Sequence, residues 1–238
     1  MRLNKFLALC GVASRRKCDE IILNGDILVN EEKIVKLGTV IDENKDVIKY
    51  KNNIITLPSN YVYFKLNKPK GYITSVKDER DRKTVMDLVK TDVRIFPVGR
   101  LDYDSEGLII LTNDGEIANK LTHPSSEVEK TYIVKIEGSI KESELAVLRN
   151  GVVIDGEKFG KSKVNLLSYD SKKNESRLQV KIKEGKNREI RRMFEHIGKN
   201  ITLLKRISIG NIKLGNLNRG EYRPLNNQEI MYLNSIGV

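Results

Sequence analysis

Residues 99–115 read GRLDYDSEGLIILTNDG and predict a charged loop between two buried strands. Pro97-Val98 leads into a turn, and residues 108–111 form an unbroken apolar run that ends at a second turn signal. Short apolar runs bounded by turn residues are typical of buried strands. An arginine and three carboxylates fall between the two strands. Loops that rigid elements position in this way often carry function.

Four interpretations of this acidic loop compete. A solvated turn is the simplest, and a calcium loop using Asp102, Asp104 and Glu106 is the second. The calcium interpretation fails because the twelfth position is Asn113 rather than a bidentate glutamate, and because the flanks have strand patterns. A glycosidase with Asp102 and Asp104 as its carboxylate pair is the third. A single nucleophilic aspartate with an adjacent arginine is the fourth, and the loop alone does not decide between them.

The overall charge predicts a polyanionic partner. The 238 residues include 43 Lys and Arg against 32 Asp and Glu, a net charge of +11. The excess is uneven: residues 181–223 hold twelve basic and four acidic residues, while residues 1–60 hold ten and eight. A basic stripe so placed is typical of a nucleic-acid footprint, because each neutralised phosphate releases counterions.

Cysteine, histidine and apolar content exclude several other classes. Two cysteines, Cys10 and Cys18, predict a reducing compartment without a disulfide framework. The two histidines are isolated, so no metal site is expected. No apolar stretch approaches the roughly 20 residues that cross a bilayer. We therefore expect a cytoplasmic protein with no membrane contact, and we expect a monomer.

Residues 1–50 predict a small module of two helices on a small sheet. Apolar residues at helical spacing mark a helix over residues 2–10, and Ser14 is a plausible N-cap for a second helix that ends at Gly25. Strands are expected at residues 27–29 and 47–50, with a linker at 51–60. Basic residues occupy the N-terminus of the second helix, where backbone N–H groups favour phosphate. They are Arg15, Arg16 and Lys17.

The rest of the chain predicts strands with interspersed helices. Residues expected in strands are 61–66, 130–136, 178–182, 203–209 and 211–214, and those expected in helices are 84–89, 116–121, 142–148, 190–197 and 226–234. Short connections between such elements indicate an α+β domain with a largely antiparallel sheet.

The N-terminal motifs resemble the small RNA-binding domain named after ribosomal protein S-four. The residues that carry the resemblance are Met1 to Leu7, Ala13 to Arg16 and Gly25 to Asn30. The resemblance implies RNA contacts from Arg15, Arg16 and Lys17, and a solvated helix end is the alternative. The resemblance covers residues 1 to about 50, and with the linker that follows we expect an RNA-binding domain at residues 1–58 and a catalytic domain at 59–238.

Four motifs of the larger segment resemble the ribosomal RNA pseudouridine synthases that modify a single uridine. They are Asn67-Lys68-Pro69-Lys70-Gly71, Gly99-Arg100-Leu101-Asp102, Lys130-Thr131-Tyr132 and the run from Gly185 to Met193. The resemblance implies the pseudouridine synthase fold, a catalytic Asp102, a Tyr132 that lies against the target ring and an Arg191 that pairs with the aspartate. It favours the fourth interpretation of the loop. The sequence Asn187-Arg188-Glu189 is more similar to the members that act on large-subunit RNA.

This chemistry suits the residue types present. The reaction moves uracil from a nitrogen to a carbon bond without electron or phosphate transfer, so no cofactor is expected. A nearby arginine keeps the aspartate ionised and oriented. Whether Asp102 attacks the sugar or the base stays open. The base must be flipped out of the RNA, and Arg100 can fill the vacated space, contact phosphate or pair with Asp104. Tyr132 can also be a core aromatic.

The remaining basic motif residues are expected to contact ribosomal RNA, and Asp104 and Glu106 are expected to shape the loop. Together with the N-terminal cluster, the expected RNA-binding residues are Arg100, Lys68, Lys70, Lys186, Arg188 and Arg192. Three rival functions stay open: the same reaction on small-subunit RNA, a ribosome-associated RNA-binding protein without catalysis, and a base-excising glycosidase that releases free uracil.

Overall fold

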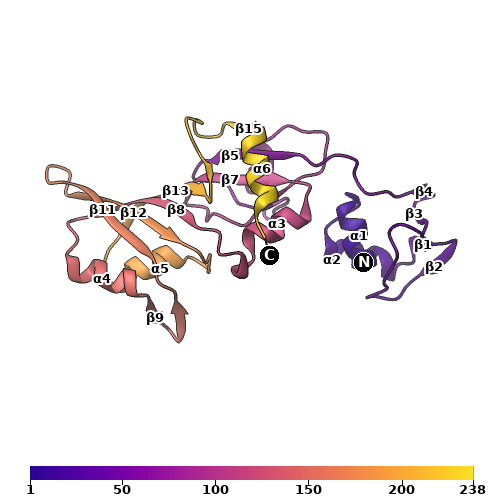
Figure 1. The fold of residues 1–238 in the computed structure, drawn as a ribbon, viewed down its shortest axis with the longest axis horizontal. Coiled ribbons are helices and arrows are strands. Elements are labelled where there is room, and N and C mark those ends of the chain that lie inside the picture. The colour runs from indigo at the N-terminus through magenta and orange to yellow at the C-terminus, as the bar shows by residue number, and fades with distance from the viewer. Residues whose placement is uncertain (238) are drawn as a thin grey trace. The chain divides into compact units, whose positions relative to one another are not determined.

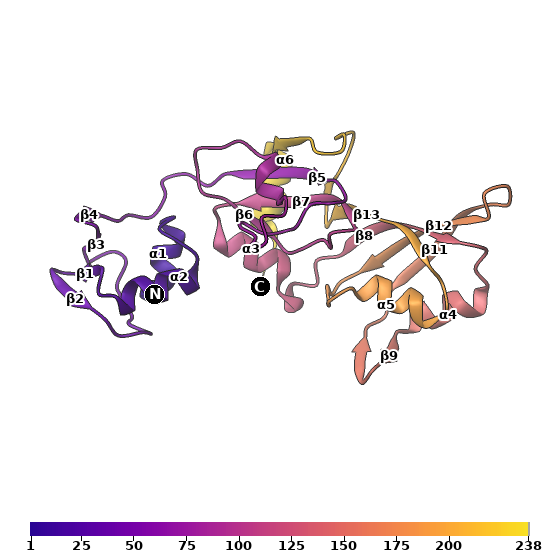
Figure 2. The same cartoon turned by 180° about the vertical axis from the view of Figure 1, so that it is seen from behind.

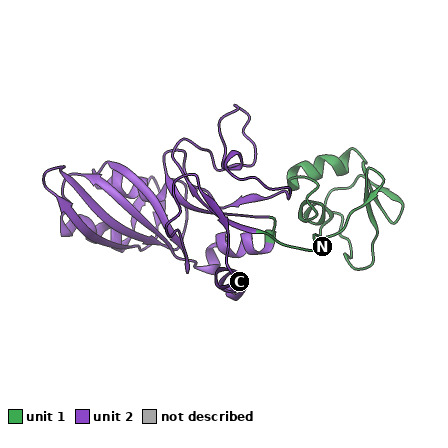
Figure 3. Cartoon of the chain, turned by 90° about the horizontal axis from the view of Figure 1, so that it is seen from above, with its two compact units in different colours: residues 1–62, 113–115 green, residues 63–112, 116–238 purple. Residues whose placement is uncertain are grey.

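A computed structural model describes residues 1–237 of the chain, and Figures 1 and 2 show its elements from two sides. The chain forms two compact units, coloured separately in Figure 3. The first comprises Met1–Val62 with residues 113–115. The second comprises Tyr63–Thr112 and the described residues from Glu116 onward.

The first unit packs two helices on a four-stranded sheet, and Ser14 caps the second helix by accepting the amide hydrogen of Lys17. Its elements are α1 Leu3–Leu9, α2 Arg15–Leu23, β1 Ile27–Val29, β2 Glu32–Ile34, β3 Ile48–Tyr50 and β4 Asn53–Ile54, with strand order β2-β1-β3-β4. The core includes Leu3, Phe6 and Ile22. The sequence patterns did not indicate β2, and β4 lies within the expected linker.

The second unit is built on a nine-stranded sheet with the order β11-β12-β8-β13-β7-β5-β15, in which β14 pairs with β13 and β6 with β7. Its strands are β5 Tyr63–Lys68, β6 Phe96–Val98, β7 Glu106–Thr112, β8 Lys130–Glu137, β11 Lys163–Asp170, β12 Glu175–Ile182, β13 Ile201–Ile209, β14 Ile212–Lys213 and β15 Tyr222–Pro224, and a separate hairpin joins β9 Val152–Ile154 to β10 Glu157–Phe159. Its helices are η1 Val85–Leu88, α3 Gly115–Thr122, η2 Pro124–Ser126, α4 Glu142–Asn150, α5 Glu189–His196 and α6 Asn227–Ser235. The predicted α+β architecture with a largely antiparallel sheet is confirmed.

Two hydrophobic cores hold the sheet. In the first, α4 and α5 lie together on one face of β11, β12, β8 and β13 (Figures 1 and 2). In the second, α3 and α6 pack with β7 and β14. Strand β7 lies at the centre of this second core region, since residues 108–111 are fully buried. Burying each such side chain stabilises the fold by about 1.5–3 kcal/mol. The loop that precedes β7 is therefore attached to a firmly packed strand.

The two halves of the sheet meet where β7 and β13 pair in parallel, and we call this junction the seam. In the strand register, the backbone of Lys205 lies opposite that of Glu106, and the backbone of Arg206 lies opposite that of Gly107. Gly107 has φ of 110°, and a Cβ built there would lie 2.2 Å from the backbone oxygen of Arg206. Only glycine permits so close an approach with that backbone conformation.

The sequence patterns miss several edge elements. The β9–β10 hairpin, β11 and β15 were not predicted, and the expected strand at residues 61–66 extends to Lys68. Strand β11 shows why: most of its side chains are exposed, and its pairing with β12 has a bulge between Leu166 and Ser168. An exposed edge strand with a bulge has no clean alternation of apolar and polar residues.

Candidate active site

Asp102 lies on the connection between β6 and β7, two strands that pair as an antiparallel hairpin. The connection is fixed from inside the protein. The Thr74 hydroxyl donates to the Leu101 carbonyl at 2.7 Å and accepts from the Leu101 amide at 3.2 Å. Leu101 is buried in the first core, and the Ser105 amide donates to the Asp102 carbonyl. The backbone on both sides of Asp102 is therefore held while its carboxylate stays one-third exposed.

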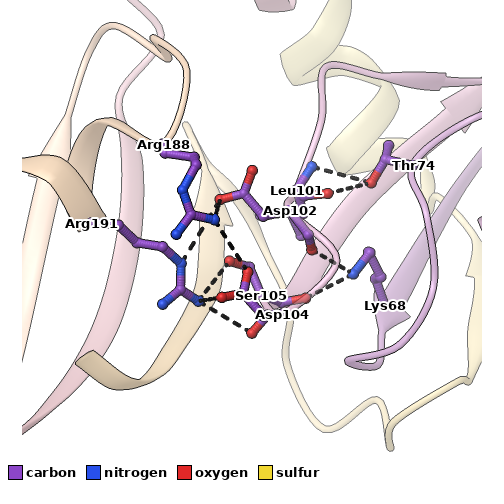
Figure 4. A network of polar contacts seen from close by, with 8 residues as sticks. All are labelled: Lys68, Thr74, Leu101, Asp102, Asp104, Ser105, Arg188 and Arg191. Carbon is purple, nitrogen blue, oxygen red and sulfur yellow. Dashed lines mark hydrogen bonds and ion pairs between the residues drawn. The ribbon is translucent and has the colours of Figure 1, made fainter. Parts of the chain in front are cut away.

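Lys68 supports the same loop from the end of β5. Its side chain has no exposed surface, and its Nζ donates to the carbonyls of Ser105 at 2.8 Å and Asp102 at 2.9 Å (Figure 4). A third bond reaches the Pro69 carbonyl at 3.2 Å. Burial lowers the pKa of Lys68 to about 8, although nearby carboxylates oppose this shift. The burial of its ammonium group does not support the RNA contact expected from Lys68, which no RNA complex tests.

Two arginines of the α5 region face the acidic loop. Arg191 Nη2 lies 3.1 Å from Asp104 Oδ2, and it donates to the Asp104 carbonyl and the Ser105 hydroxyl at 3.2 Å each. Arg191 Nε lies 3.9 Å from Asp102 Oδ2 and has no hydrogen-bond partner among the described residues. Arg188 Nη1 lies 3.9 Å from Asp102 Oδ2 and 3.8 Å from Asp104 Oδ1. Figure 4 shows both arginines directed at the loop.

The amphipathic pattern of α5 explains this placement. Ile190, Met193 and Phe194 pack into the first core, as the sequence predicts. Arg191 follows Ile190 at the margin of that buried face, so its side chain is 12% exposed and borders the loop. Burial lowers the pKa of Arg191, and the neighbouring Asp104 carboxylate opposes that shift. The arginine nonetheless remains charged, because an ordinary guanidinium has a very high pKa.

A cavity of about 530 Å³ opens beside Asp102. The loop at 99–102 and the segment 182–190 form two of its walls, and Tyr132 from β8 and Arg206 from β13 also line it. Tyr132 is 8% exposed and packs against the first core. It therefore combines the two alternatives considered for it, a core aromatic and a pocket wall. Its contact with a target ring stays a prediction.

Arg206 is a cavity residue that sequence reasoning missed. It is 5% exposed, its Nε donates to the Leu108 carbonyl at 2.7 Å, and its Nη2 has no hydrogen-bond partner among the described residues. Neighbouring Lys130 also lines the cavity; burial lowers its pKa, and the charge of Arg206 lowers it further. A signal was present, because Arg206 lies two positions after Leu204 along β13, which places the arginine on the same face as a core leucine.

Arg192, another residue predicted to contact RNA, lies apart from Asp102 and the residues that line the cavity. Arg192 pairs with Glu157 and with Asp155 at 3.5 Å, and its guanidinium lies 4.7 Å from the Phe159 ring centre. One residue along a helix turns the side chain by about 100°, so Arg192 leaves the face that Arg191 occupies. The structure does not bring Arg192 to the cavity.

Three further basic residues border the catalytic region. Arg100 lines the cavity and is exposed. The ion pair considered between Arg100 and Asp104 is absent from the described residues, since Asp104 pairs with Arg188 and Arg191. Lys186 lines the cavity and pairs with Glu184 at 3.0 Å. Lys70 is exposed, and its Nζ donates to the Thr202 carbonyl at 3.1 Å.

The first unit presents its basic residues at the start of α2. Arg15, Arg16 and Lys17 are exposed, and Lys17 pairs with Glu20. Their contact with RNA stays a prediction. Glu106, expected to shape the acidic loop, lies buried in β7 and pairs with Arg219 at 3.0 Å.

Residues 1–237 lack two other kinds of feature. No group of three or more histidine, cysteine or acidic side chains there could hold a metal ion. No helix in this part of the chain is long and apolar enough to cross a membrane.

A continuous sheet that carries an aspartate beside a basic cavity is an arrangement suited to chemistry on a nucleic acid, and known proteins with this arrangement are pseudouridine synthases. The crystal structure of a pseudouridylate synthase is similar to this chain, with a TM-score of 0.70 and 29% sequence identity. The match covers 98% of this chain and 99% of the chain in the crystal structure. The family model of RNA pseudouridylate synthases matches residues 62–196, and that of the S4 domain matches residues 1–47. The chain belongs to the RNA pseudouridylate synthase family, and the resemblance seen in the sequence is confirmed.

Relatives agree over the whole chain. The ribosomal large subunit pseudouridine synthase B of Bacillus subtilis is 42% identical over 99% of this chain and 96% of its own length. An uncharacterized RNA pseudouridine synthase of Aquifex aeolicus is 38% identical over 98% of this chain and 93% of its own length. The protein is therefore an RNA pseudouridine synthase, which excludes the reading as a binding protein without catalysis and the glycosidase reading.

Proposed function

We propose that this enzyme converts one uridine of large-subunit ribosomal RNA to pseudouridine, with Asp102 as the essential catalytic residue. The large-subunit target rests on the 42% identity with the large-subunit synthase of Bacillus subtilis over nearly the full length of both chains. The catalytic assignment rests on one observation: Asp102 is the cavity-lining carboxylate within 4 Å of both Arg188 and Arg191.

The reaction is an isomerisation, so its atoms balance without a co-reactant. The bond from C1′ of ribose to N1 of uracil breaks, the ring turns, and C1′ bonds to C5. The proton on C5 is lost to a base, and N1 gains one. Asp102 acts as a nucleophile or offsets positive charge on the sugar, and the two neighbouring arginines orient its carboxylate toward the cavity.

The remaining cavity residues have roles that follow from their positions. Tyr132 would lie against the flipped uracil, because its buried ring forms one wall. Arg100, exposed at the mouth, would fill the space that the flipped nucleotide leaves in the RNA. Lys70, Lys186 and Arg188 would contact phosphates near the target nucleotide.

We assign residues 1–58 to RNA binding and residues 59–238 to catalysis. Arg15, Arg16 and Lys17 would supply phosphate contacts from the first unit. A monomer in the cytoplasm fits this function, since a single chain supplies Asp102 and Tyr132 to the cavity and places Arg191 beside Asp102, and ribosomal RNA is the proposed substrate. Light scattering of the purified protein, alone and with RNA, tests the monomer.

The test is to map the modified nucleotide. Purified protein is incubated with unmodified transcripts of large- and small-subunit ribosomal RNA from Bacillus subtilis, and pseudouridines are located by carbodiimide labelling and primer extension. We expect one new pseudouridine in the large-subunit RNA. Asp102→Asn serves as the matched control, because the amide preserves shape and removes charge.

Modification of the small-subunit transcript alone would overturn the target but retain the reaction. Full conversion by folded Asp102→Asn protein would overturn the catalytic assignment.

A further inference from the structure

The sheet of the second unit carries another cavity, on the face opposite α4 and α5. It has a volume of about 750 Å³ and lies over strands β12, β8 and β13. The strand register places its residues in three rows, which are Arg177–Lys135–Leu203, Gln179–Ile133–Lys205 and Lys181–Thr131–Ser208. We call this surface the Arg177 groove.

Strand alternation separates the groove from the catalytic cavity. Thr131 and Ile133 line the groove, while Tyr132 between them lines the catalytic cavity and Val134 lies in the core. No lining residue is shared between the two cavities. Successive side chains of a strand point to opposite faces. A ligand in the groove is therefore on the other side of the sheet from Asp102.

The groove carries an excess of positive charge that the folded chain does not neutralise. Six cations line it, and three of them are paired: Lys135 with Glu175, Lys181 with Glu129, and Arg219 with Glu106. Arg177, Lys205 and Lys213 have no carboxylate within 4 Å among residues 1–237. Glu106 is the single carboxylate residue of the lining, and Arg219 already occupies it.

This arrangement is unfavourable for folding by itself. Arg177 and Lys135 are direct cross-strand partners, and like charges placed directly opposite one another destabilise a sheet. The glutamate beside Lys135 neutralises one of the two, which leaves Arg177 unneutralised. A polyanion bound in the groove would offset the repulsion.

The shape and composition of the groove favour phosphates over bases. Thr131 and Ile133 are short and buried, so they form a floor beneath longer basic side chains at the rim. No aromatic residue lines the groove, and base stacking on protein depends on aromatic rings. Phosphate contacts provide affinity without reading sequence.

We propose that the Arg177 groove binds the phosphate backbone of a ribosomal RNA segment separate from the segment that carries the target uridine. The proposal rests on the ribosomal RNA substrate proposed above. Such a second contact raises affinity for a long, folded RNA and adds nothing for a short RNA that contains the target alone.

The test compares two double charge reversals in the full-length protein. Arg177→Glu with Lys205→Glu alters the groove. Lys172→Glu with Lys173→Glu alters the exposed turn between β11 and β12 and changes the net charge by the same amount. Dissociation constants are measured over a salt series with large-subunit RNA of Bacillus subtilis, and turnover is measured with a short stem-loop around the mapped uridine.

We expect the groove pair to bind the long RNA at least about tenfold more weakly than the turn pair, with a salt slope reduced by about two. Its turnover on the short stem-loop should equal that of the parent. Equal losses in both pairs would show an effect of net charge alone and overturn the proposal. Unchanged RNA affinity with lost binding of poly-glutamate would assign the groove to an acidic protein and also overturn it.

Two controls keep the outcome interpretable. If the reversals lower the melting temperature, Arg177→Gln with Lys205→Gln replaces them, with a smaller expected loss of affinity. If the parent leaves the large-subunit RNA unmodified, the proposed target fails, while the comparison of binding constants still decides the groove.

Discussion

Arg191 is bound more closely by Asp104 than by Asp102, the residue to which we assign catalysis. Its Nη2 lies 3.1 Å from Asp104 Oδ2, whereas its Nε lies 3.9 Å from Asp102 Oδ2. Asp104 thus anchors the end of the guanidinium, and the free Nε is left facing Asp102. A small movement of the arginine or of Asp102 would complete that hydrogen bond.

Asp104→Asn should lower kcat by about tenfold to a hundredfold, which is the cost of one lost charge-assisted hydrogen bond. KM should change little, because Asp104 holds Arg191 and not the RNA. Steady-state kinetics on the short stem-loop measure both constants. Asp104→Glu, which keeps the charge, should recover part of the loss. A residue that only shapes the loop would leave kcat unchanged in Asp104→Asn.

Asp102→Asn should lower kcat by several orders of magnitude, since an amide is a poor nucleophile and carries no charge. RNA affinity should stay within about tenfold of the parent, because phosphate contacts dominate binding. Single-turnover kinetics and filter binding give the two values. If Asp104→Asn lost as much activity as Asp102→Asn, a mechanism with two catalytic carboxylates would be favoured.

Lys68→Met should destabilise the acidic loop by about 1–3 kcal/mol for each buried carbonyl left without a donor. Thermal unfolding measures the loss, and Lys70→Met at the exposed neighbouring position should have little effect. An equal loss in both variants would contradict a supporting role specific to Lys68.

The stability of the parent relative to Lys68→Met should also depend on pH. The pKa of Lys68 is about 8 in the folded protein and 10.5 ordinarily. Below pH 8 both states are protonated, and the folded state bears the full cost of the buried charge. Between pH 8 and 10.5 the unfolded state binds more protons, so the free energy of unfolding rises with pH. A flat difference across this window would contradict the assignment.

Gly107→Ala should destabilise the second unit strongly, because the new Cβ would lie 2.2 Å from the Arg206 backbone oxygen. Gly138→Ala is the matched control: Gly138 also has a positive φ, of 79°, but its Cβ would meet no atom within 4 Å. The difference in melting temperature between the two variants isolates the clash from backbone strain. Equal melting temperatures would show that the seam can open to admit a methyl group.

Much of the fold is readable from the sequence because buried strands and amphipathic helices leave periodic patterns. The apolar run at residues 108–111 predicted β7, and the spacing of Ile190, Met193 and Phe194 predicted α5. The exposed edge strand β11 left no such pattern. Local periodicity records burial, so elements with little burial escape it.

The site residues were harder to place, because charge alone does not reveal where a side chain points. Lys68 belongs to a basic motif, yet three backbone carbonyls hold it inside the protein. Arg206 reaches the cavity from β13 because its strand pairs with β7 and β8. Those pairings join distant segments, so no local motif could have predicted them.

The seam between β7 and β13 has a consequence for the order of events in folding. Asp102 precedes β7 in one half of the sheet, while Arg191 belongs to the other half, and Asp104 and Arg191 are 87 positions apart in the chain. Contacts between such distant positions form only after the chain has lost the entropy of closing a long loop, and their favourable free energy comes afterwards. Helices and hairpins can therefore form within each half while the enzyme is still inactive, and a nascent chain has no catalytic centre until β13 has paired with β7.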